Sequence, residues 1–505
     1  MHPGAHDPDR AAVVMAGSGE TVSYGELESR STQLARFWHQ QGLRKGDHVA
    51  IFLENHPRYF EVVWAALRSG LYYTPVNHHL TVGEIAYVLD DCGARSVVTS
   101  RARAAQVAGL EVEVRLMVDG HIAGWRPYEQ VLAEQPTEPL ADQPCGHGMF
   151  YSSGTTGRPK GILFPLPDRQ VTDDDPMIQP GSPLGLADGC VYLLPAPLYH
   201  TSPVVTGAMC HRYGGTVVVM ERFDAEACLD AIDRYQVDVA QFVPTMFVRL
   251  LKLQESVRDN HDLSSLRHVS HAAAPCPIDV KRRMIEWWGP IIIEFYAGSE
   301  NVGSTMITSE EWLAHPGSVG LPRYCTAHIC DEAFNELPAG ETGDVWFDTP
   351  GAAMEYHGDP AKTAESRSPQ GWYTMGDVGR LDEDGYLYLT DRKTFMIISG
   401  GVNIYPQEAE NVLIGHPAVL DVAVIGVPNE DLGEEAKAVV QLVAGTDASP
   451  ELETTLMAFC AEQLARYKCP RSIDFVDALP REDSGKLYKQ RLRAAYWDGR
   501  DSGII

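Results

Sequence analysis

The first 390 residues alternate between helical and extended hydrophobic patterns, which is typical of an α/β protein. Ser23 and Glu26 form a capping box ahead of an amphipathic helix that is predicted to run to about Gln41. Further along, short apolar runs bounded by Gly, Pro or charged residues predict strands at 48–53, 191–194, 216–220 and 291–296. Helical patterns lie between them, near 58–68, 225–235 and 280–288.

The pattern starts afresh near Asp391-Arg392, where a strand that follows an Asp-Glu-Asp-Gly turn ends. Downstream, the chain predicts a helix at 407–414, two strands at 419–427 and 436–443, and a helix at 451–466 opened by Ser449 as N-cap and Pro450. About 110 residues are enough for an independent domain. We therefore expect a large N-terminal α/β domain, residues 1–391, with stacked sheets and helices, and a small α+β domain, residues 392–505.

Composition agrees with a globular protein of several subdomains. The 505 residues are 44% hydrophobic and 22% charged, and no apolar stretch is long enough to span a membrane. The N-terminal residues lack the apolar core of a signal peptide, so we expect a cytoplasmic protein. None of the ten cysteines forms a C-x-x-C pair, which favours reduced, mostly buried thiols over a zinc site.

The net charge of −28 argues against nucleic acid or an anionic membrane as a partner, because both require basic patches. An enzyme that binds an anionic nucleotide would need local cations to reverse this field. Candidates for those cations occur in one segment of the chain.

Residues 151–161 read Tyr-Ser-Ser-Gly-Thr-Thr-Gly-Arg-Pro-Lys-Gly. Glycines let the backbone approach a ligand, successive N–H groups form an anion-binding concavity, and hydroxyl groups add neutral donors. Arg158 and Lys160 supply positive charge. The segment therefore predicts a phosphate-binding loop, although Pro159 stands where a Walker A loop would need its second glycine.

The run S-S-G-T-T-G-x-P-K-G resembles the signature loop of the adenylate-forming enzymes, which include acyl-CoA synthetases, luciferases and the adenylation domains of peptide synthetases. The resemblance implies that the loop holds the phosphates of ATP while a carboxylate attacks the α-phosphorus. By position, the phosphate-binding residues would be Ser152, Ser153, Gly154, Thr155, Thr156, Gly157 and Lys160.

Three further segments match the family in order. Tyr296-Ala-Gly-Ser-Glu300 resembles its aromatic-Gly-x-Thr/Ser-Glu motif, which implies that Tyr296 lies near adenine, Ser299 touches phosphate and Glu300 helps to hold Mg²⁺. Ala273, in an Ala-Ala-Ala-Pro segment, would form part of the adenine wall. Asp377 would accept hydrogen bonds from both ribose hydroxyls, with Arg392 beside it.

The longest match spans residues 391–410, in which Gly400 and Gly401 would line the channel for the pantetheine arm of coenzyme A. Thr394 stands where many family members carry an Asp or Lys hinge, so the identity of the hinge residue stays open. Lys486, in Pro-Arg-Glu-Asp-Ser-Gly-Lys, resembles the lysine that reaches into the adenylation site from a mobile lid. Its ammonium would stabilise the developing charge, as positioned donors do.

The segment that borders the acyl pocket reads Pro195-Ala-Pro-Leu-Tyr-His-Thr. The peptide-synthetase branch places an Asp there to hold a substrate ammonium, whereas this chain has Tyr199-His200. His200 would gate the pocket or help to position the thiol. Because the other candidate pocket residues are small or apolar, we expect an uncharged acyl group; they are Val204, Val205, Ala208, Phe242, Met246, Ala297 and Gly298.

Together these matches predict an ATP-dependent acyl-CoA synthetase acting with Mg²⁺ on a hydrophobic acid, either fatty or cyclic such as aromatic or steroid-derived. No carrier-protein module follows the lid, which favours free coenzyme A as acceptor. Transfer to an amine, giving an amide, is the alternative, and a luciferase-like oxygenase or a non-catalytic nucleotide-binding regulator are more distant ones. We expect a monomer or homodimer whose partners are small molecules.

Overall fold

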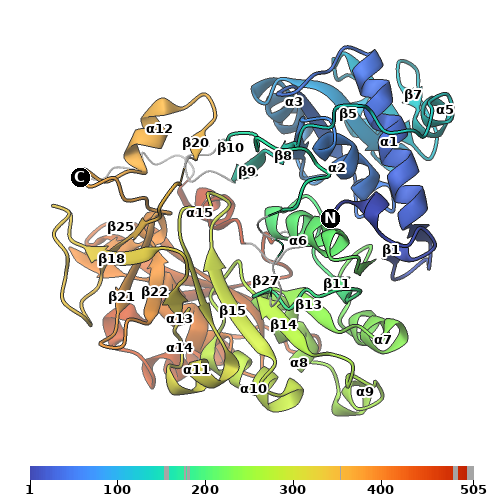
Figure 1. Cartoon of the computed structure of the whole chain (residues 1–505). Coiled ribbons are helices and arrows are strands. Elements are labelled where there is room, and N and C mark those ends of the chain that lie inside the picture. The colour runs from blue at the N-terminus through green and yellow to red at the C-terminus, as the bar shows by residue number, and fades with distance from the viewer. Residues whose placement is uncertain (153–158, 176–177, 179–181, 353, 482–486, 498–505) are drawn as a thin grey trace. The chain divides into compact units, whose positions relative to one another are not determined.

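The computed structural model describes the chain except residues 153–158, 176–177, 179–181, 353, 482–486 and 498–505 (Figure 1). It contains two compact units, each assembled from separate stretches of sequence. The first unit comprises residues 1–242, 253–270 and 351–365. The second comprises residues 243–252, 271–350 and 366–505.

A six-stranded parallel sheet forms one half of the first unit, in the order β7-β6-β5-β3-β4-β8. Its central strands are almost entirely buried, as expected for a parallel sheet that is covered on both faces. The strands are β3 (His48–Phe52), β4 (Tyr72–Pro75), β5 (Ala94–Ser100), β6 (Val114–Val118), β7 (Arg126–Pro127) and β8 (His147–Gly148).

A second set of strands in this unit lies in the order β2-β1-β12-β11-β13, parallel except for the β1–β2 pair. These strands are β1 (Ala11–Met15), β2 (Thr21–Ser23), β11 (Val191–Leu194), β12 (Thr216–Val219) and β13 (Val239–Phe242). One hydrophobic core joins side chains of both sheets to those of α1, α2 and α6. The helices of the unit are α1 (Tyr24–Gln40), α2 (Tyr59–Leu67), α3 (Val82–Asp91), α4 (Ala104–Val107), α5 (Tyr128–Ala133), α6 (Thr201–Arg212), α7 (Ala225–Tyr235), α9 (Glu255–Arg258) and α12 (Pro360–Glu365).

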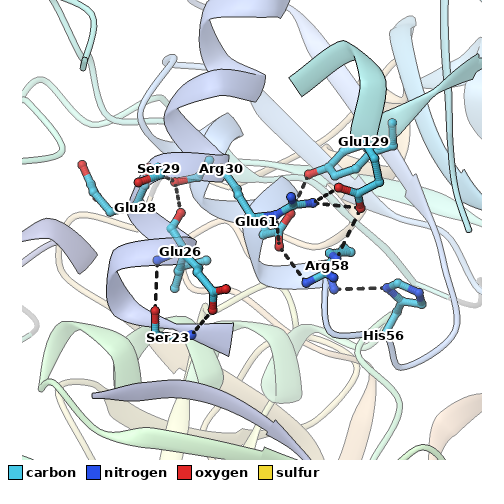
Figure 2. Close-up of polar contacts among 12 residues, drawn as sticks. Ser23, Glu26, Glu28, Ser29, Arg30, His56, Arg58, Glu61 and Glu129 are labelled. Carbon is cyan, nitrogen blue, oxygen red and sulfur yellow. Dashed lines mark hydrogen bonds and ion pairs between the residues drawn. The ribbon is translucent and has the colours of Figure 1, made fainter. Parts of the chain in front are cut away.

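Helix α2 brings a carboxylate into that core. All of its residues are buried, Glu61 included. The Glu61 carboxylate accepts hydrogen bonds from Arg30 Nε of α1 at 2.7 Å and from the Tyr128 hydroxyl of α5 at 3.0 Å. Arg58 and Glu129 complete this ionic cluster, which ties three helices together (Figure 2).

A small antiparallel sheet, in the order β20-β10-β9, carries the ends of the predicted phosphate loop. Strand β9 (Phe150–Ser152) leads into the loop and β10 (Lys160–Leu163) leaves it. Strand β20 (Glu355–Tyr356) pairs with the far side of β10. The register places Lys160 opposite Ser152, so the two ends of the loop are held side by side.

The second unit contains two antiparallel strand groups before residue 393. Strands β15, β16 and β17 pair in sequence, and a four-stranded sheet has the order β18-β19-β21-β22. The elements are α8 (Pro244–Leu251), α10 (Ile278–Trp288), α11 (Ser309–Ala314), β15 (Ile292–Ala297), β16 (Ser304–Ile307), β17 (Leu321–Pro322), β18 (Thr326–Cys330), β19 (Gly343–Asp348), β21 (Asp377–Leu381) and β22 (Leu387–Arg392). Strand β14 (His268–His271) lies where the chain passes from the first unit to the second.

The C-terminal part has its own sheet, in which β27 lies parallel to β26 and the other strands follow the order β24-β23-β26-β25. Helices α13 and α14 and the sheet share a separate hydrophobic core, as an independent α+β module requires. The elements are β23 (Ile397–Ser399), β24 (Val402–Ile404), α13 (Pro406–Leu413), β25 (Val419–Asn429), β26 (Gly433–Leu442), α14 (Pro450–Ala461), β27 (Ser472–Val476) and α15 (Lys489–Trp497).

These elements confirm the mixed α/β architecture with several sheets. The Ser23–Glu26 capping box is present, as is the Ser449 N-cap ahead of Pro450. The predicted end of the last of these helices is wrong, because α14 stops at Ala461 rather than Arg466. Leu464 and Cys469 turn back onto the lid core, which ends the helix early.

Candidate active site

Three predicted nucleotide-binding residues meet in the second unit. Tyr296 lies near the end of β15, Asp377 begins β21 and Arg392 ends β22, where it pairs directly with Asp377 across the antiparallel ladder. The Tyr296 hydroxyl donates to Asp377 Oδ2 at 2.5 Å, and Arg392 Nε lies 3.0 Å from Oδ1. The strands thus gather an aromatic ring, a carboxylate and a guanidinium from positions far apart in the sequence.

The cluster combines the buried carboxylate of Asp377 with the partly exposed guanidinium of Arg392. Burial raises the pKa of the Asp377 carboxyl, and the nearby Arg392 charge opposes that shift. The pKa of Tyr296 is raised well above its usual value, mainly by burial, so its hydroxyl stays a donor. The Asp377 side chain is 8% exposed and that of Arg392 is 48% exposed, so the arginine is the solvent-facing member of the pair.

Glu300 lies one tight turn beyond Tyr296. The Asn301 N–H donates to the Gly298 carbonyl at 3.0 Å, with Asn301 itself at φ +48°. A Cβ on Gly298 would sit 2.5 Å from Glu300 Oε2 and 2.6 Å from Met375 Sδ, so any larger residue here would displace the carboxylate and the thioether from these positions. The exposed Ala297 and the half-buried Ser299 share this turn.

The donor set at Glu300 fits Mg²⁺ better than a transition metal. Mg²⁺ is commonly held by one or two carboxylates together with substrate phosphates and water. Across the described parts of the chain, no group of three or more His, Cys, Asp or Glu side chains could hold a metal by protein ligands alone. A site completed by nucleotide phosphates is consistent with both facts.

Ala273, the candidate adenine-wall residue, follows strand β14 and adopts φ +76°. A side-chain-bearing residue in this region is uncommon and strained, and such residues concentrate at ligand sites. The side chain is exposed. The backbone therefore marks this position as unusual independently of the motif.

The phosphate-loop residues divide into described and undescribed positions. Ser153, Gly154, Thr155, Thr156, Gly157 and Arg158 lie outside the described residues, and so does Lys486. Lys160 is described, and its Nζ donates to Asp359 Oδ2 at 2.6 Å within the first unit. On either side of the Lys486 segment, Arg481 and Leu487 form a bridge, and Arg481 binds Asp421 of β25 through two hydrogen bonds of 2.5 and 2.8 Å.

The candidate acyl-pocket residues fall into both units. His200 occupies the N-cap position of α6 without a side-chain capping hydrogen bond, and the centroid of its ring lies 4.3 Å from that of Tyr199. Val204 and Ala208 of α6 belong to the core of the first unit, with Val205 packed against it, and Phe242 is buried at the end of β13. Met246 is buried in the second unit, which also holds Ala297 and Gly298.

Gly400 and Gly401 form the two-residue loop of the β23–β24 hairpin, with Ser399 paired to Val402. Their φ values of +57° and +80° make a type I′ turn, which requires positive φ at both positions. A local reason for the glycine pair therefore exists, and their role in a coenzyme A channel stays a prediction. Thr394 lies in a short 3₁₀ helix, Lys393–Phe395, directly after β22.

Sequence reasoning missed Asp359 and Met375. The Gly-Asp-Pro sequence at 358–360 signals a helix N-cap. It gives no hint, however, that the carboxylate pairs with a lysine 199 residues earlier. Met375 lies in the Trp-Tyr-Thr-Met-Gly-Asp segment that ends at Asp377, but no role was predicted for it from the sequence, and its contact with position 298 appears only in the structure.

No helix within the described residues is long and apolar enough to cross a membrane. Comparison with known proteins matches residues 2–357 to the AMP-binding enzyme family and residues 408–486 to the AMP-binding enzyme C-terminal domain. The feruloyl-CoA synthase of an Amycolatopsis species is 34% identical over 491 residues, covering 96% of both chains.

Two solved structures are similar over nearly their full length. ATP-bound MatB from Rhodopseudomonas palustris has a TM-score of 0.80 at 28% identity, covering 97% of each chain. The amide bond synthetase McbA from Marinactinospora thermotolerans has a TM-score of 0.79 at 26% identity, covering 98% of each. With its large N-terminal and small C-terminal domains, the chain belongs to the AMP-binding enzymes of the adenylate-forming superfamily.

Proposed function

We propose that this protein is an ATP-dependent acid–CoA ligase acting on a hydrophobic carboxylic acid. The observation that carries the proposal is the Tyr296–Asp377–Arg392 cluster, a ready acceptor for ribose hydroxyls with Glu300 one turn away. It occurs in a chain that matches the AMP-binding enzymes over residues 2–357 and their C-terminal domain over residues 408–486.

The reaction has two steps. In the first, a carboxylate oxygen of the acid bonds to the α-phosphorus of ATP and pyrophosphate leaves, giving the acyl-adenylate. In the second, the thiolate of coenzyme A attacks the acyl carbon and AMP leaves with the bond electrons, giving the thioester. Exclusion of water during this sequence protects the reactive adenylate from hydrolysis.

The chain's own residues would orient the nucleotide and stabilise charge. Asp377 accepts hydrogen bonds from the ribose hydroxyls, and Lys160 with the hydroxyl groups of its loop binds the phosphates of ATP. Bound to Glu300, Mg²⁺ would neutralise phosphate charge. Lys486 then approaches from residues 392–505, which we treat as a lid hinged near residues 391–392, and stabilises the charge that develops between carboxylate and phosphate.

For the acid, the absence of an acidic residue at Tyr199-His200 and the apolar side chains on α6 favour an uncharged acyl group. Among such acids we place aromatic ones first, because a relative with 34% identity is a feruloyl-CoA synthase. His200 would gate the pocket, and Gly400 and Gly401 would line the path of the pantetheine arm. Such an enzyme works where ATP and coenzyme A are available, in the cytoplasm, as a monomer or homodimer.

A substrate panel tests this proposal. The purified protein is incubated with ATP, Mg²⁺ and ferulate, benzoate, fatty acids of increasing length or a steroid acid, with coenzyme A or an amine added separately. Thioester formation with release of AMP and pyrophosphate is expected. The similarity to McbA favours amide formation as the second candidate. Amide without thioester would establish that alternative and contradict acid–CoA ligation.

Lys486→Ala tests the role of the lid lysine. Loss of one positioned donor costs about 10²–10³ in rate, so adenylate formation should fall by that factor while ATP binding persists. Lys468→Ala is the matched control, since this lid lysine pairs with Glu408 at 2.6 Å and has no proposed role in the chemistry. Full adenylation activity in the Lys486 variant would remove that residue from the mechanism.

A further inference from the structure

The phosphate-loop lysine has an acidic partner built into its own unit. Lys160 opens β10, and Asp359 precedes helix α12, just after strand β20 on the far side of β10 (Figure 1). The distance from Lys160 Nζ to Asp359 Oδ2 is 2.6 Å, with the two side chains 22% and 34% exposed. The hydrogen bond from Lys160 is the main reason that the pKa of Asp359 lies below its usual value, so the carboxyl is ionised at neutral pH.

Backbone contacts hold Asp359 in place. The His357 N–H donates to the Gly161 carbonyl at 2.8 Å, which fixes the segment against β10 immediately after Lys160. The Asp359 N–H donates to the Tyr356 carbonyl at 3.1 Å, and the Thr363 hydroxyl donates to the Asp359 carbonyl at 3.0 Å. The carboxylate is therefore presented to the lysine by a short, well-anchored turn.

The two carboxylate oxygens of Asp359 contact different partners. Oδ1 accepts the Lys362 N–H at 2.9 Å, which caps the first turn of α12. Oδ2 faces Lys160. Capping does not require a negative charge, because asparagine caps helices as well as aspartate does. The charge of Asp359 is thus unnecessary for the turn; it acts chiefly on Lys160 and more weakly on Lys362.

We propose that Asp359 is an internal counter-ion that competes with nucleotide phosphates for the Lys160 ammonium, and so weakens retention of ATP and of the pyrophosphate product. This inference rests on the proposed role of Lys160. In a protein with a net charge of −28, the carboxylate neutralises a cation of the phosphate site while no nucleotide is bound. When phosphate binds, the Lys160–Asp359 ion pair is replaced by an ion pair between Lys160 and phosphate. The free energy gained on phosphate binding is therefore smaller, which allows pyrophosphate to leave after the first step.

Direct binding measurements test the competition. Calorimetry with Mg·ATP and with Mg·pyrophosphate, without acid or coenzyme A, compares the wild type with Asp359→Asn. Exposed ion pairs of this kind shift affinity by about two- to fivefold, so the variant should bind both probes more tightly by that factor. Binding should also weaken more steeply with added salt in the variant, because Lys160 then meets the phosphates unneutralised.

Two further variants separate charge from structure. Asp359→Glu keeps the charge and should return both affinities toward wild type. Asp224→Asn is the matched control, since Asp224 caps α7 through the Ala227 N–H at 3.0 Å and has no proposed role in phosphate binding. Urea unfolding of each variant confirms an intact fold.

Three outcomes overturn the inference. Weaker binding in Asp359→Asn would mean that the carboxylate helps to hold the nucleotide, through the metal or by orienting Lys160. Equal affinity and equal salt dependence would mean that no competition exists. Failure of the wild type to bind either probe would overturn the proposed function together with this inference, whereas the first two results leave the ligase proposal standing.

Discussion

The Glu61 cluster and the Asp377 cluster are built from the same three groups but differ in their surroundings. Each has a buried carboxylate that accepts from a tyrosine hydroxyl, Tyr128 in one and Tyr296 in the other, and pairs with an arginine. In both, burial raises the pKa of the carboxyl while the arginine opposes the shift. A perturbed pKa alone therefore does not distinguish structure from function.

The neighbouring side chains distinguish the Glu61 cluster from the Asp377 cluster. Around Glu61, Arg30 also binds Glu129 at 2.8 Å (Figure 2) and Arg58 also binds Glu20 at 3.1 Å, so each arginine side chain, 21% and 24% exposed, has a second carboxylate partner. Around Asp377, the arginine side chain is 48% exposed at the end of a strand. A closed network stabilises a fold, whereas a network with an accessible cation can exchange a partner for a ligand.

Glu61→Ala should produce the largest effect on stability. Removing one member of a buried ion pair leaves its partners uncompensated, at a cost of about 3–5 kcal/mol in the free energy of unfolding. Urea unfolding measures this loss, and the affinity for ATP of the remaining folded protein should match wild type. A loss of ATP affinity without a loss of stability would break the comparison.

Asp377→Ala should have the opposite profile. A hydrogen bond to a charged group contributes about 1.5–3 kcal/mol, so ATP binding should weaken by roughly 10- to 100-fold. Titration with ATP measures this, with Glu61→Ala as the control for nonspecific damage. Unchanged ATP affinity would remove Asp377 from the nucleotide site.

Removing a single hydroxyl group, from Tyr128 or from Tyr296, tests the same difference between the two clusters with a smaller change. Tyr128→Phe should lower the free energy of unfolding by about 1 kcal/mol, the contribution of one hydrogen bond. Tyr296→Phe should instead raise the KM for ATP about two- to tenfold, because Asp377 loses the donor that orients it. Equal effects of both variants on KM would show that the clusters are not functionally distinct.

Glu61 should also make the free energy of unfolding depend on pH. Its pKa is higher in the folded than in the unfolded protein, so the folded state binds more protons in the window above pH 4.5, the ordinary value. The free energy of unfolding of wild type relative to Glu61→Gln should therefore fall as pH rises through this window, by at most about 1.4 kcal/mol per pH unit. A difference that is flat from pH 4.5 to 8 would contradict the raised pKa.

Local signals in the sequence predicted local structure well. The Ser23–Glu26 capping box and the Ser449-Pro450 start of α14 depend on neighbouring residues and are present. The end of α14 depends on how Leu464 packs against the lid core, and the helix pattern did not reveal it. Motifs named Tyr296, Asp377 and Arg392, but their contacts result from strand pairing between distant segments.

Ion pairs between residues that belong to no common motif could not be predicted from the sequence. The Lys160–Asp359 ion pair depends on β20 adding to β10 across nearly two hundred residues, which no periodicity encodes. The same holds for Glu61, which sits in an apolar helix and becomes interpretable only beside Arg30 and Tyr128. Ion pairs between residues far apart in the sequence are thus the contacts that the structure revealed and the sequence did not.

The turn formed by Gly400 and Gly401 limits which substitutions these two positions can accept during evolution. Both residues need a left-handed backbone, which asparagine tolerates better than most side chains. Within the described part of the chain, and apart from its neighbours, a Cβ at position 401 meets no heavy atom within 4 Å, whereas one at 400 lies 3.0 Å from Leu432 Cδ2. Among natural relatives, position 401 should therefore admit asparagine on its own, while change at position 400 should be accompanied by a smaller residue at 432.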